Sequence, residues 1–358
     1  MPSLKEIKGR INSISSTLAI TSAMKMVASA KLQKAQMAIQ NMLPYERRLY
    51  SMLLDLMGAM NISAAASEDG SVRGSGSAER GFDQSGDRLS LSNRHDLAGM
   101  DGAYSLMAQR EVRKVAIVAF ASNSSLCGAF NSNVIREATA VINEYRASGL
   151  GDADITVYSV GRKMAEAMKK LGFPSPADFT KMSDSPSYDA ASALAQELLD
   201  GFVSGRFDKV ELVYNHYKST SSQPTIRQTY LPLSLADATA DLQAGKIADS
   251  ASESDTNRGA EPVGAPVVRQ GSPTTEDLIV EPSKEELIAT LLPKVVRLRV
   301  FTTLLDSTAA EQAARTVAMQ LATDNGNDLL QELTLEYNKG RQQKITSEIL
   351  DLVGGSMQ

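Results

Sequence analysis

Few side chains in this sequence could carry nucleophilic or metal chemistry. The 358 residues include one cysteine, Cys127, and two histidines, His95 and His216. A single cysteine excludes an internal disulfide and a multi-cysteine zinc site. Cys127 has no histidine near it in sequence, so we predict a buried structural thiol rather than a nucleophile. His216 closes a strand-like run and is predicted to be packed or exposed rather than a ligand.

The polar loop Ser122–Asn131 is the one segment that could bind an anion. It separates a strand-like run from a helical one, where free backbone N–H groups gather. It lacks the spacing of the known glycine-rich phosphate loops. The alternative is a simple turn, with Asn131 or Ser132 capping the following helix, and this interpretation is favoured. Acidic pairs such as Glu285 and Glu286 suit the start of a helix, so no catalytic residue, metal site or cofactor is predicted.

Composition narrows the class of protein. The net charge of −5 argues against general nucleic-acid binding. The longest strongly apolar run, Val115–Ala121, is far shorter than the ~20 residues that cross a bilayer, and the N-terminus does not read as a signal peptide. We therefore expect a protein of the cytoplasm or of a membrane-bound complex, without membrane insertion of its own.

Residues 1–60 are predicted to form a long helix. Ser3 and Glu6 have the spacing of a capping box. Pro44 is expected to break or kink the helix. In the first part of this helix, apolar residues recur at the spacing of a coiled-coil seam, at Leu4, Ile7, Ile11, Ile14 and Leu18.

The stretch after this seam is apolar on more than one side. The wider stripe comprises Ile20, Ala23, Met24, Met26, Val27, Ala28 and Ala30. Residues 1–50 also carry eight basic and two acidic side chains, although the whole chain is acidic. This pattern predicts apolar surroundings on several sides of the helix and an acidic partner.

Residues 110–234 read as an α/β domain. Strand-like runs lie at 112–121, 155–160, 207–214 and 225–233, and helical runs at 133–147, 162–171 and 188–203, with Gly172 closing the second helix. Strands that alternate with helices predict a Rossmann-like domain with a mostly parallel sheet.

Two low-complexity insertions flank the α/β domain. Residues 61–109 are rich in glycine, serine and charge. Residues 235–282 hold nine acidic and three basic side chains up to Glu281, with a short helix possible at 235–242. Both are expected to be flexible.

Residues 283–358 are predicted to be helical again. Ser283 and Glu286 form another possible capping box, and Pro293 is expected to kink the helix early. Gly326 and Gly340 lower helix propensity but need not end the helix. The mostly apolar C-terminal tip is unusual for a free terminus. An antiparallel coiled coil of the two ends of the chain, with the α/β domain at one end, satisfies all of these patterns.

Several of these segments resemble the gamma subunit of F-type ATP synthases. The stretch 20–36 (ITSAMKMVASAKLQKAQ) is similar to its N-terminal helix, and 126–131 (LCGAFN) to its central loop. The stretches 311–325 (EQAARTVAMQLATDN) and 337–348 (YNKGRQQKITSE) are similar to its C-terminal helix. The motifs occur in the family's order and cover the chain apart from the two insertions.

The resemblance implies a rotor shaft, with no substrate, cofactor or chemistry of its own. Its partners would be three α and three β subunits, an epsilon subunit and the membrane c-ring. The implied location is the cytoplasmic face of a bacterial inner membrane, as a peripheral subunit. A stand-alone α/β enzyme and a coiled-coil adaptor are the alternatives. The residues implied to contact partners, or to brace the two helices, are Met24, Lys25, Arg315, Arg341, Gln342, Thr346, Glu348, Ile349, Leu352 and Val353.

The sequence departs from the family pattern in the central loop. Asn123-Ser-Ser precedes Leu-Cys-Gly where the family usually has Asp-Arg-Gly, which puts a family salt bridge there in doubt. The second insertion falls where chloroplast gamma subunits carry a redox insertion, but it has no cysteine, so a thiol switch is excluded. It is either an electrostatic brake on ATP hydrolysis or a tolerated solvated loop.

Overall fold

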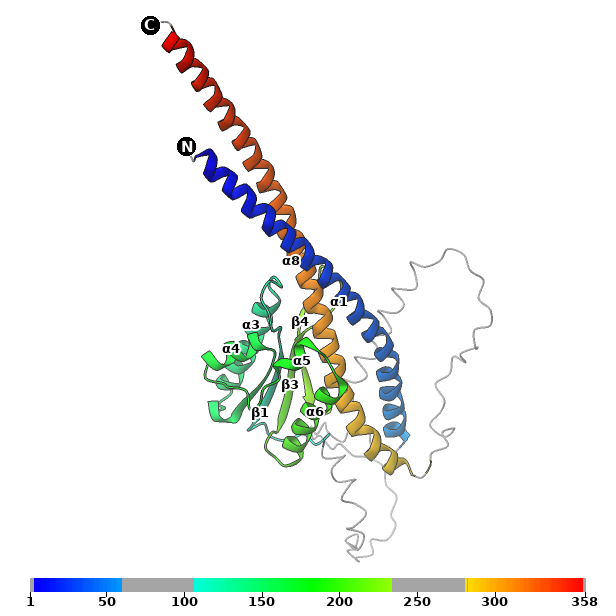
Figure 1. The fold of residues 1–358 in the computed structure, drawn as a ribbon. Coiled ribbons are helices and arrows are strands. Elements are labelled where there is room, and N and C mark those ends of the chain that lie inside the picture. The colour runs from blue at the N-terminus through cyan, green and yellow to red at the C-terminus, as the bar shows by residue number, and fades with distance from the viewer. Residues whose placement is uncertain (1–2, 60–105, 234–280, 282, 357–358) are drawn as a thin grey trace, which may run out of the picture.

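The computed structural model describes residues 3–59, 106–233, 281 and 283–356. Two long helices, α1 (Leu4–Ala59) and α8 (Lys284–Ser356), lie side by side and run antiparallel, and an α/β domain packs near one end of the pair (Figure 1). This confirms the predicted coiled coil with an attached α/β domain. The short helix proposed at 235–242, and both insertions apart from residues 106–109 and 281, lie outside the described residues.

Both long helices begin at the predicted serine caps. The N–H of Glu6 donates to Ser3 Oγ at 3.2 Å, and the N–H of Glu286 donates to Ser283 Oγ at 3.2 Å. Each bond satisfies one of the N–H groups that a helix leaves open in its first turn. These serines therefore set where the two helices start.

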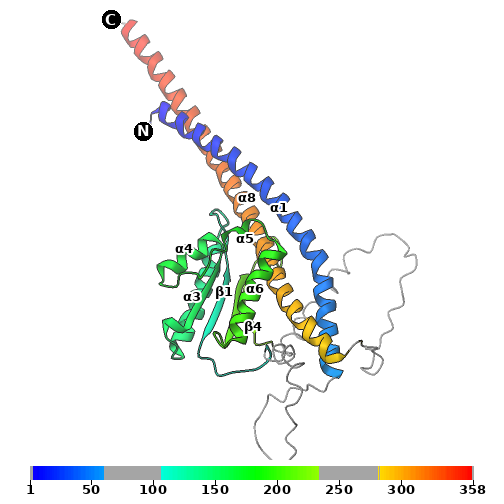
Figure 2. The ribbon, with the colours of Figure 1, turned by 60° about the horizontal axis from the view of Figure 1, so that its bottom comes forward.

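A break or a kink was expected at Pro44, and the break is wrong, because α1 continues through this residue to Ala59. Pro44 has no N–H to donate to the backbone carbonyl of Gln40, one turn earlier. Both residues are exposed, so water can bond to that carbonyl instead. Leu32 and Leu49, on either side, are buried and hold the helix in place. The axis of α1 bends in its second half without interruption (Figure 2). Likewise, α8 continues through Pro293.

The α/β domain is built on a four-stranded sheet in the order β2-β1-β3-β4. The strands are β1 (Val115–Phe120), β2 (Ile155–Val160), β3 (Lys209–Asn215) and β4 (Thr225–Leu231). β1 pairs in parallel with β2 and β3, whereas β4 pairs antiparallel with β3. The last pairing follows from the short hairpin that joins β3 to β4. The sheet is thus mostly parallel, as predicted.

Helices cover both faces of the sheet, so the central strand is buried on each. Helices α3 (Phe130–Ala147) and α4 (Arg162–Lys170) pack on one face. Helix α6 (Tyr188–Val203) and α8 pack on the other, beside a short helix, α5 (Thr180–Asp184), that the pattern did not predict. Alternate residues of β1 enter the two cores, which explains its continuous apolar run.

The chain re-enters the described structure at a buried leucine. Leu106 is 3% exposed, lies in the core shared by α6 and α8, and its carbonyl accepts a bond from the N–H of Leu233. Met107 packs against the same core. The sequence had placed both residues in the first insertion, because a two-residue apolar pair is too short to show a periodic pattern.

Gly326 lets the two long helices approach closely. A Cβ added there would lie 2.6 Å from Leu18 Cδ2, whereas a Cβ added at Gly9 would meet nothing within 4 Å. We expect Gly9→Ala to raise the free energy of unfolding by about 1 kcal/mol through helix propensity. Gly326→Ala should lose that gain, because Leu18 must move.

Urea unfolding followed by far-ultraviolet circular dichroism checks this matched pair, since the two long helices dominate that signal. Combining Gly326→Ala with Leu18→Ala should recover part of the difference. Equal gains at Gly9 and Gly326 would contradict the close approach.

Candidate functional site

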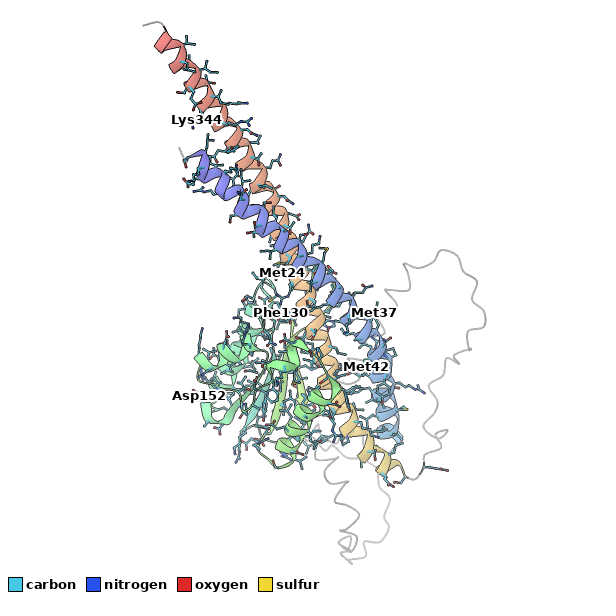
Figure 3. All side chains as sticks on the ribbon, viewed as in Figure 1. Met24, Met37, Met42, Phe130, Asp152 and Lys344 are labelled. Carbon is cyan, nitrogen blue, oxygen red and sulfur yellow. The ribbon has the colours of Figure 1, made fainter. Side chains whose placement is uncertain are left out.

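The C-terminal part of α8 projects beyond the start of α1 as a single helix. A Cβ at Gly340 would lie 3.2 Å from Leu4 Cδ2, so pairing with α1 reaches this level of α8. From Arg341 to Leu350 every residue is exposed, and Lys344 marks this bare stretch in Figure 3. The large apolar side chains of this stretch are 47–75% exposed, namely Ile345, Ile349, Leu350, Leu352 and Val353.

The predicted polar contact residues lie on this same stretch. Arg341 and Gln342 are exposed. Thr346 Oγ1 donates to the Gln342 carbonyl at 2.9 Å, and Glu348 lies 3.7 Å from Lys344 Nζ. Exposed pairs of this kind contribute little to stability. These side chains are therefore available to a partner at small cost.

Met24 lies on α1 where the helix passes above the α/β domain (Figure 3), and Lys25 is the next residue of this helix. Both are half-buried. Their neighbours Ile20, Met26 and Val27 are 57–66% exposed. The helix pair thus covers only part of the predicted apolar stripe, as expected for a surface that needs a further partner.

Arg315 points the other way, into the joint between α8 and the α/β domain. Its guanidinium donates to the Ser125 carbonyl at 2.7 Å, to Ser124 Oγ at 2.9 Å and to Glu311 Oε1 at 2.6 Å. Burial raises the pKa of Glu311, and the bond from Arg315 opposes that rise. In this structure Arg315 attaches the loop after β1 to α8.

That loop is held by its own side chains. Asn131 does not cap α3, contrary to one prediction, since α3 starts at Phe130 after an N-cap, Ala129, without a side-chain bond. Instead, Asn131 Oδ1 accepts from the N–H of Ser122 at 3.0 Å. Cys127 is buried at 1% exposure, and Asn131 Nδ2 lies 3.1 Å from its sulfur. The thiol is structural, as predicted.

A buried carboxylate organises the far side of the sheet. Glu211, on β3, accepts from Tyr145 Oη at 2.6 Å, from Lys209 Nζ at 2.7 Å and from Arg227 Nε at 2.7 Å, and its side chain is 2% exposed. Burial alone would raise the pKa of Glu211, but the bonds from Arg227, Lys209 and Tyr145 outweigh it and lower that pKa. The cluster is fully bonded and joins α3 to β3 and β4.

His216 takes part in a second joint between the α/β domain and α8. Its Nδ1 lies 2.6 Å from Asp306 Oδ2, and the N–H of Tyr217 donates to Asp306 Oδ1 at 2.8 Å. The hydrogen bond with Asp306 raises the pKa of His216, with burial acting against it. His216 is therefore half-buried and paired rather than a metal ligand.

Within the described ranges, no group of three or more His, Cys, Asp or Glu side chains could hold a metal ion. None of the helices in this part of the chain combines the length and apolar character needed to cross a membrane. The surface most open to a partner is the exposed shaft, formed by α1 up to Gln36 and by α8 beyond Arg315.

The whole chain matches known proteins. The family model described as ATP synthase covers residues 3–357. A protein from Phocaeicola vulgatus named ATP synthase gamma chain is 47% identical over 100% of both chains, and one of the same name from Bacteroides thetaiotaomicron is 46% identical over 100% of both. The chain belongs to the ATP synthase gamma-chain family. These full-length matches set aside the stand-alone enzyme and the coiled-coil adaptor.

The fold also resembles a solved member of the complex. A chain of the Euglena gracilis mitochondrial ATP synthase superposes with a TM-score of 0.52 at 18% identity, covering 99% of this chain and 93% of that chain. At that identity the likeness concerns the fold alone. As a gamma-chain family member, this protein is a subunit of the ATP synthase complex.

Sequence reasoning missed the side chains that attach the gamma-chain shaft to its α/β domain. Asp306, Tyr217 and Gln36 come from three distant parts of the chain, and none stands out by type or spacing. The one available signal was Asp306 itself, an acidic residue in an otherwise apolar and small-residue stretch of α8.

Proposed function

We propose that this chain is the central rotor shaft that couples proton flow through the membrane sector to the catalytic cycle of an F-type ATP synthase. Three α and three β subunits would surround the shaft, and the α/β domain would meet the epsilon subunit and the c-ring. The chain would carry no catalytic residue of its own. It would lie at the cytoplasmic face of the bacterial membrane as a peripheral subunit.

The bare apolar end of α8 carries this proposal. A helix end with Leu352 75% exposed is unfavourable in water, so it needs an apolar sleeve. A ring of partner subunits would supply one, with Ile349, Leu352 and Val353 inside it. Arg341, Gln342, Thr346 and Glu348 would then meet the β subunits just below.

Catalysis would act through selection among states of the β subunits. A shaft can shift the relative free energies of β conformations only if it contacts them differently. The exposed faces of α1 and α8 are unlike each other, because the basic and methionine-rich side chains around Met24 and Lys25 lie on α1. Rotation would therefore present a different surface to each β subunit in turn.

A native pull-down tests the proposal. An affinity tag placed within residues 245–272 interrupts no described helix or strand. Recovered from its own membranes, the chain should bring α, β and epsilon subunits at about three to three to one, with ATPase activity. Elution alone or as a homodimer would refute the rotor function.

A pair of double variants checks the role of the apolar tip. Leu352→Asp with Val353→Asp should lower the recovered α and β subunits at least about fivefold, because carboxylates are costly to bury in an apolar sleeve. The control, Lys169→Asp with Lys170→Asp at the exposed end of α4, should leave recovery unchanged. Equal recovery of both would contradict a buried tip.

A further inference from the structure

A second attachment point between the shaft and the α/β domain has no role assigned so far. Gln36, His216, Tyr217 and Asp306 form it, and we call it the Tyr217 junction. Gln36 Nε2 donates to Tyr217 Oη at 2.6 Å. Asp306 accepts from the N–H of Tyr217 with one oxygen and contacts His216 Nδ1 with the other. The junction therefore joins α1, α8 and the β3–β4 hairpin.

The hairpin that presents the junction is rigid before α8 contributes anything. The N–H of His216 donates to the Pro224 carbonyl at 2.9 Å, and Gln223 Nε2 donates to two carbonyls within the turn, at 3.0 and 2.6 Å. At its base, Asn215 Nδ2 donates to the Phe130 carbonyl at 3.1 Å. Tyr217 is thus held at a defined height and angle beside the shaft.

The surfaces of α1 and α8 that Tyr217 contacts are formed mainly by small side chains. Its ring packs against Leu32, Ala35, Ala309 and Ala313, and also against the small cluster around Phe130. Alanines allow close packing, but they interlock weakly, so such a surface resists sliding and rotation poorly. Hydrogen bonds depend on direction as well as distance, so the polar groups supply the orientation that the alanines do not.

The junction lies at a position along α8 where it can resist rotation of the shaft relative to the α/β domain. Towards the start of α8, a broad apolar core of residues such as Val295 and Val300 fixes the helix to the sheet. Towards its end, Arg315 is the next attachment, nine residues on, or roughly 14 Å along the helix. Between that core and Arg315, the Tyr217 junction bonds the domain to both helices at once.

We propose that the Tyr217 junction fixes the rotational position of the two-helix shaft on the α/β domain, so that Gln36, Tyr217 and Asp306 are positioning residues for torque transmission. His216 makes this attachment dependent on pH. The inference rests on the rotor function proposed above. A rotor must resist twisting between the α/β domain and the shaft, and the Tyr217 junction would provide that resistance.

The pH dependence follows from the charges that face His216. Asp306 on α8 favours the protonated ring, whereas Lys218 on the hairpin opposes it. The side chain that α1 contributes to the junction, Gln36, is neutral and is bonded to Tyr217. Because the pKa of His216 is raised above its ordinary 6.5, the charged contact is complete below that pH. It weakens as the pH rises through the higher folded value.

Membrane vesicles with the complete ATP synthase test the proposal. The quantity is protons pumped per ATP hydrolysed, at about pH 6 and about pH 8. Asp306→Asn should lower this ratio about threefold at about pH 6. Tyr217→Phe, which removes the bond to Gln36 and a 3.5 Å contact with Thr220 Oγ1 inside the hairpin, should lower it less. The control is Asp189→Asn, an exposed aspartate in the first turn of α6 rather than on the shaft.

His216→Gln supplies a readout that a merely structural role would not move. The native ratio should fall between about pH 6 and about pH 8, and the ratio in Asp189→Asn should fall with it, whereas in His216→Gln it should stay constant, since glutamine does not titrate. If the complex with Asp306→Asn does not assemble, Tyr217→Phe and His216→Gln still test the proposal. Both variants keep an aromatic ring at position 217 and the bond from the N–H of that residue to Asp306.

The two proposals fail in different ways. If the native chain does not co-purify with α and β subunits, the rotor function is wrong. If it does, and all three junction variants match Asp189→Asn at both pH values, the rotor function stands and the positioning role is overturned.

Discussion

Arg315→Ala should lower the free energy of unfolding by about 3–5 kcal/mol. The Arg315 and Glu311 side chains are each 9% exposed, and their atoms lie 2.6 Å apart. Alanine would leave the Glu311 carboxylate buried without its cation, and the carbonyl of Ser125 would lose a donor. Urea unfolding of the purified chain measures the loss.

A double variant separates the pair from its surroundings. Arg315→Met with Glu311→Gln removes both charges and keeps most of the volume, so it should cost less than half as much as Arg315→Ala. A loss below about 1 kcal/mol for Arg315→Ala would show that water replaces the guanidinium without penalty. In the assembled complex, Arg315→Ala should release the loop at Ser124 and Ser125 from α8, because Arg315 makes the hydrogen bonds to both residues.

Glu211→Ala should destabilise the α/β domain by a similar amount, about 3–5 kcal/mol. Lys209 and Arg227, whose side chains are only 26% and 27% exposed, would face each other without the carboxylate between them. Tyr145 would lose the acceptor of its hydroxyl. The matched control is Asp152→Ala, whose pair with Arg146 is largely exposed, so this substitution should change the stability far less than Glu211→Ala.

The pH dependence of the Glu211 effect has a definite sign. The folded pKa of Glu211 lies below its ordinary 4.5, so its contribution to stability is present above that pH. The contribution is lost as the pH falls through the lower folded value. Glu211→Gln should therefore unfold with a weaker dependence on pH below about 4.5 than the native chain. An unchanged acid profile would contradict the assigned cause.

Local patterns predicted most of the elements because each pattern depends on neighbours in sequence. The spacing of apolar residues placed β2 and α6 at the observed bounds. Gly172, with a positive φ, follows the end of α4 within two residues, as predicted. The serine caps placed the starts of α1 and α8. The error at Pro44 arose because a proline rule takes no account of packing on α8, which holds the helix together on both sides.

The candidate site divides along the same line. The apolar, methionine-rich stretch of α1 and the bare end of α8 were predictable, because a surface without an internal partner is visible as surplus apolar residues. Their contacts with other subunits stay predictions. Arg315 was singled out by resemblance, but its bonds to the loop after β1 could not be predicted, since the two segments lie about 190 residues apart.

By itself, the sequence determined the two long helices, the order in which helices and strands follow one another along the chain, and the family. Periodicity, caps and motifs depend only on residues close together in the chain. The tertiary structure alone decided how the α/β domain is attached to the shaft, through Arg315, Asp306 and Tyr217. Those bonds join side chains that have no local pattern, and they exist only because packing of the sheet on α8 brings distant segments within hydrogen-bond distance.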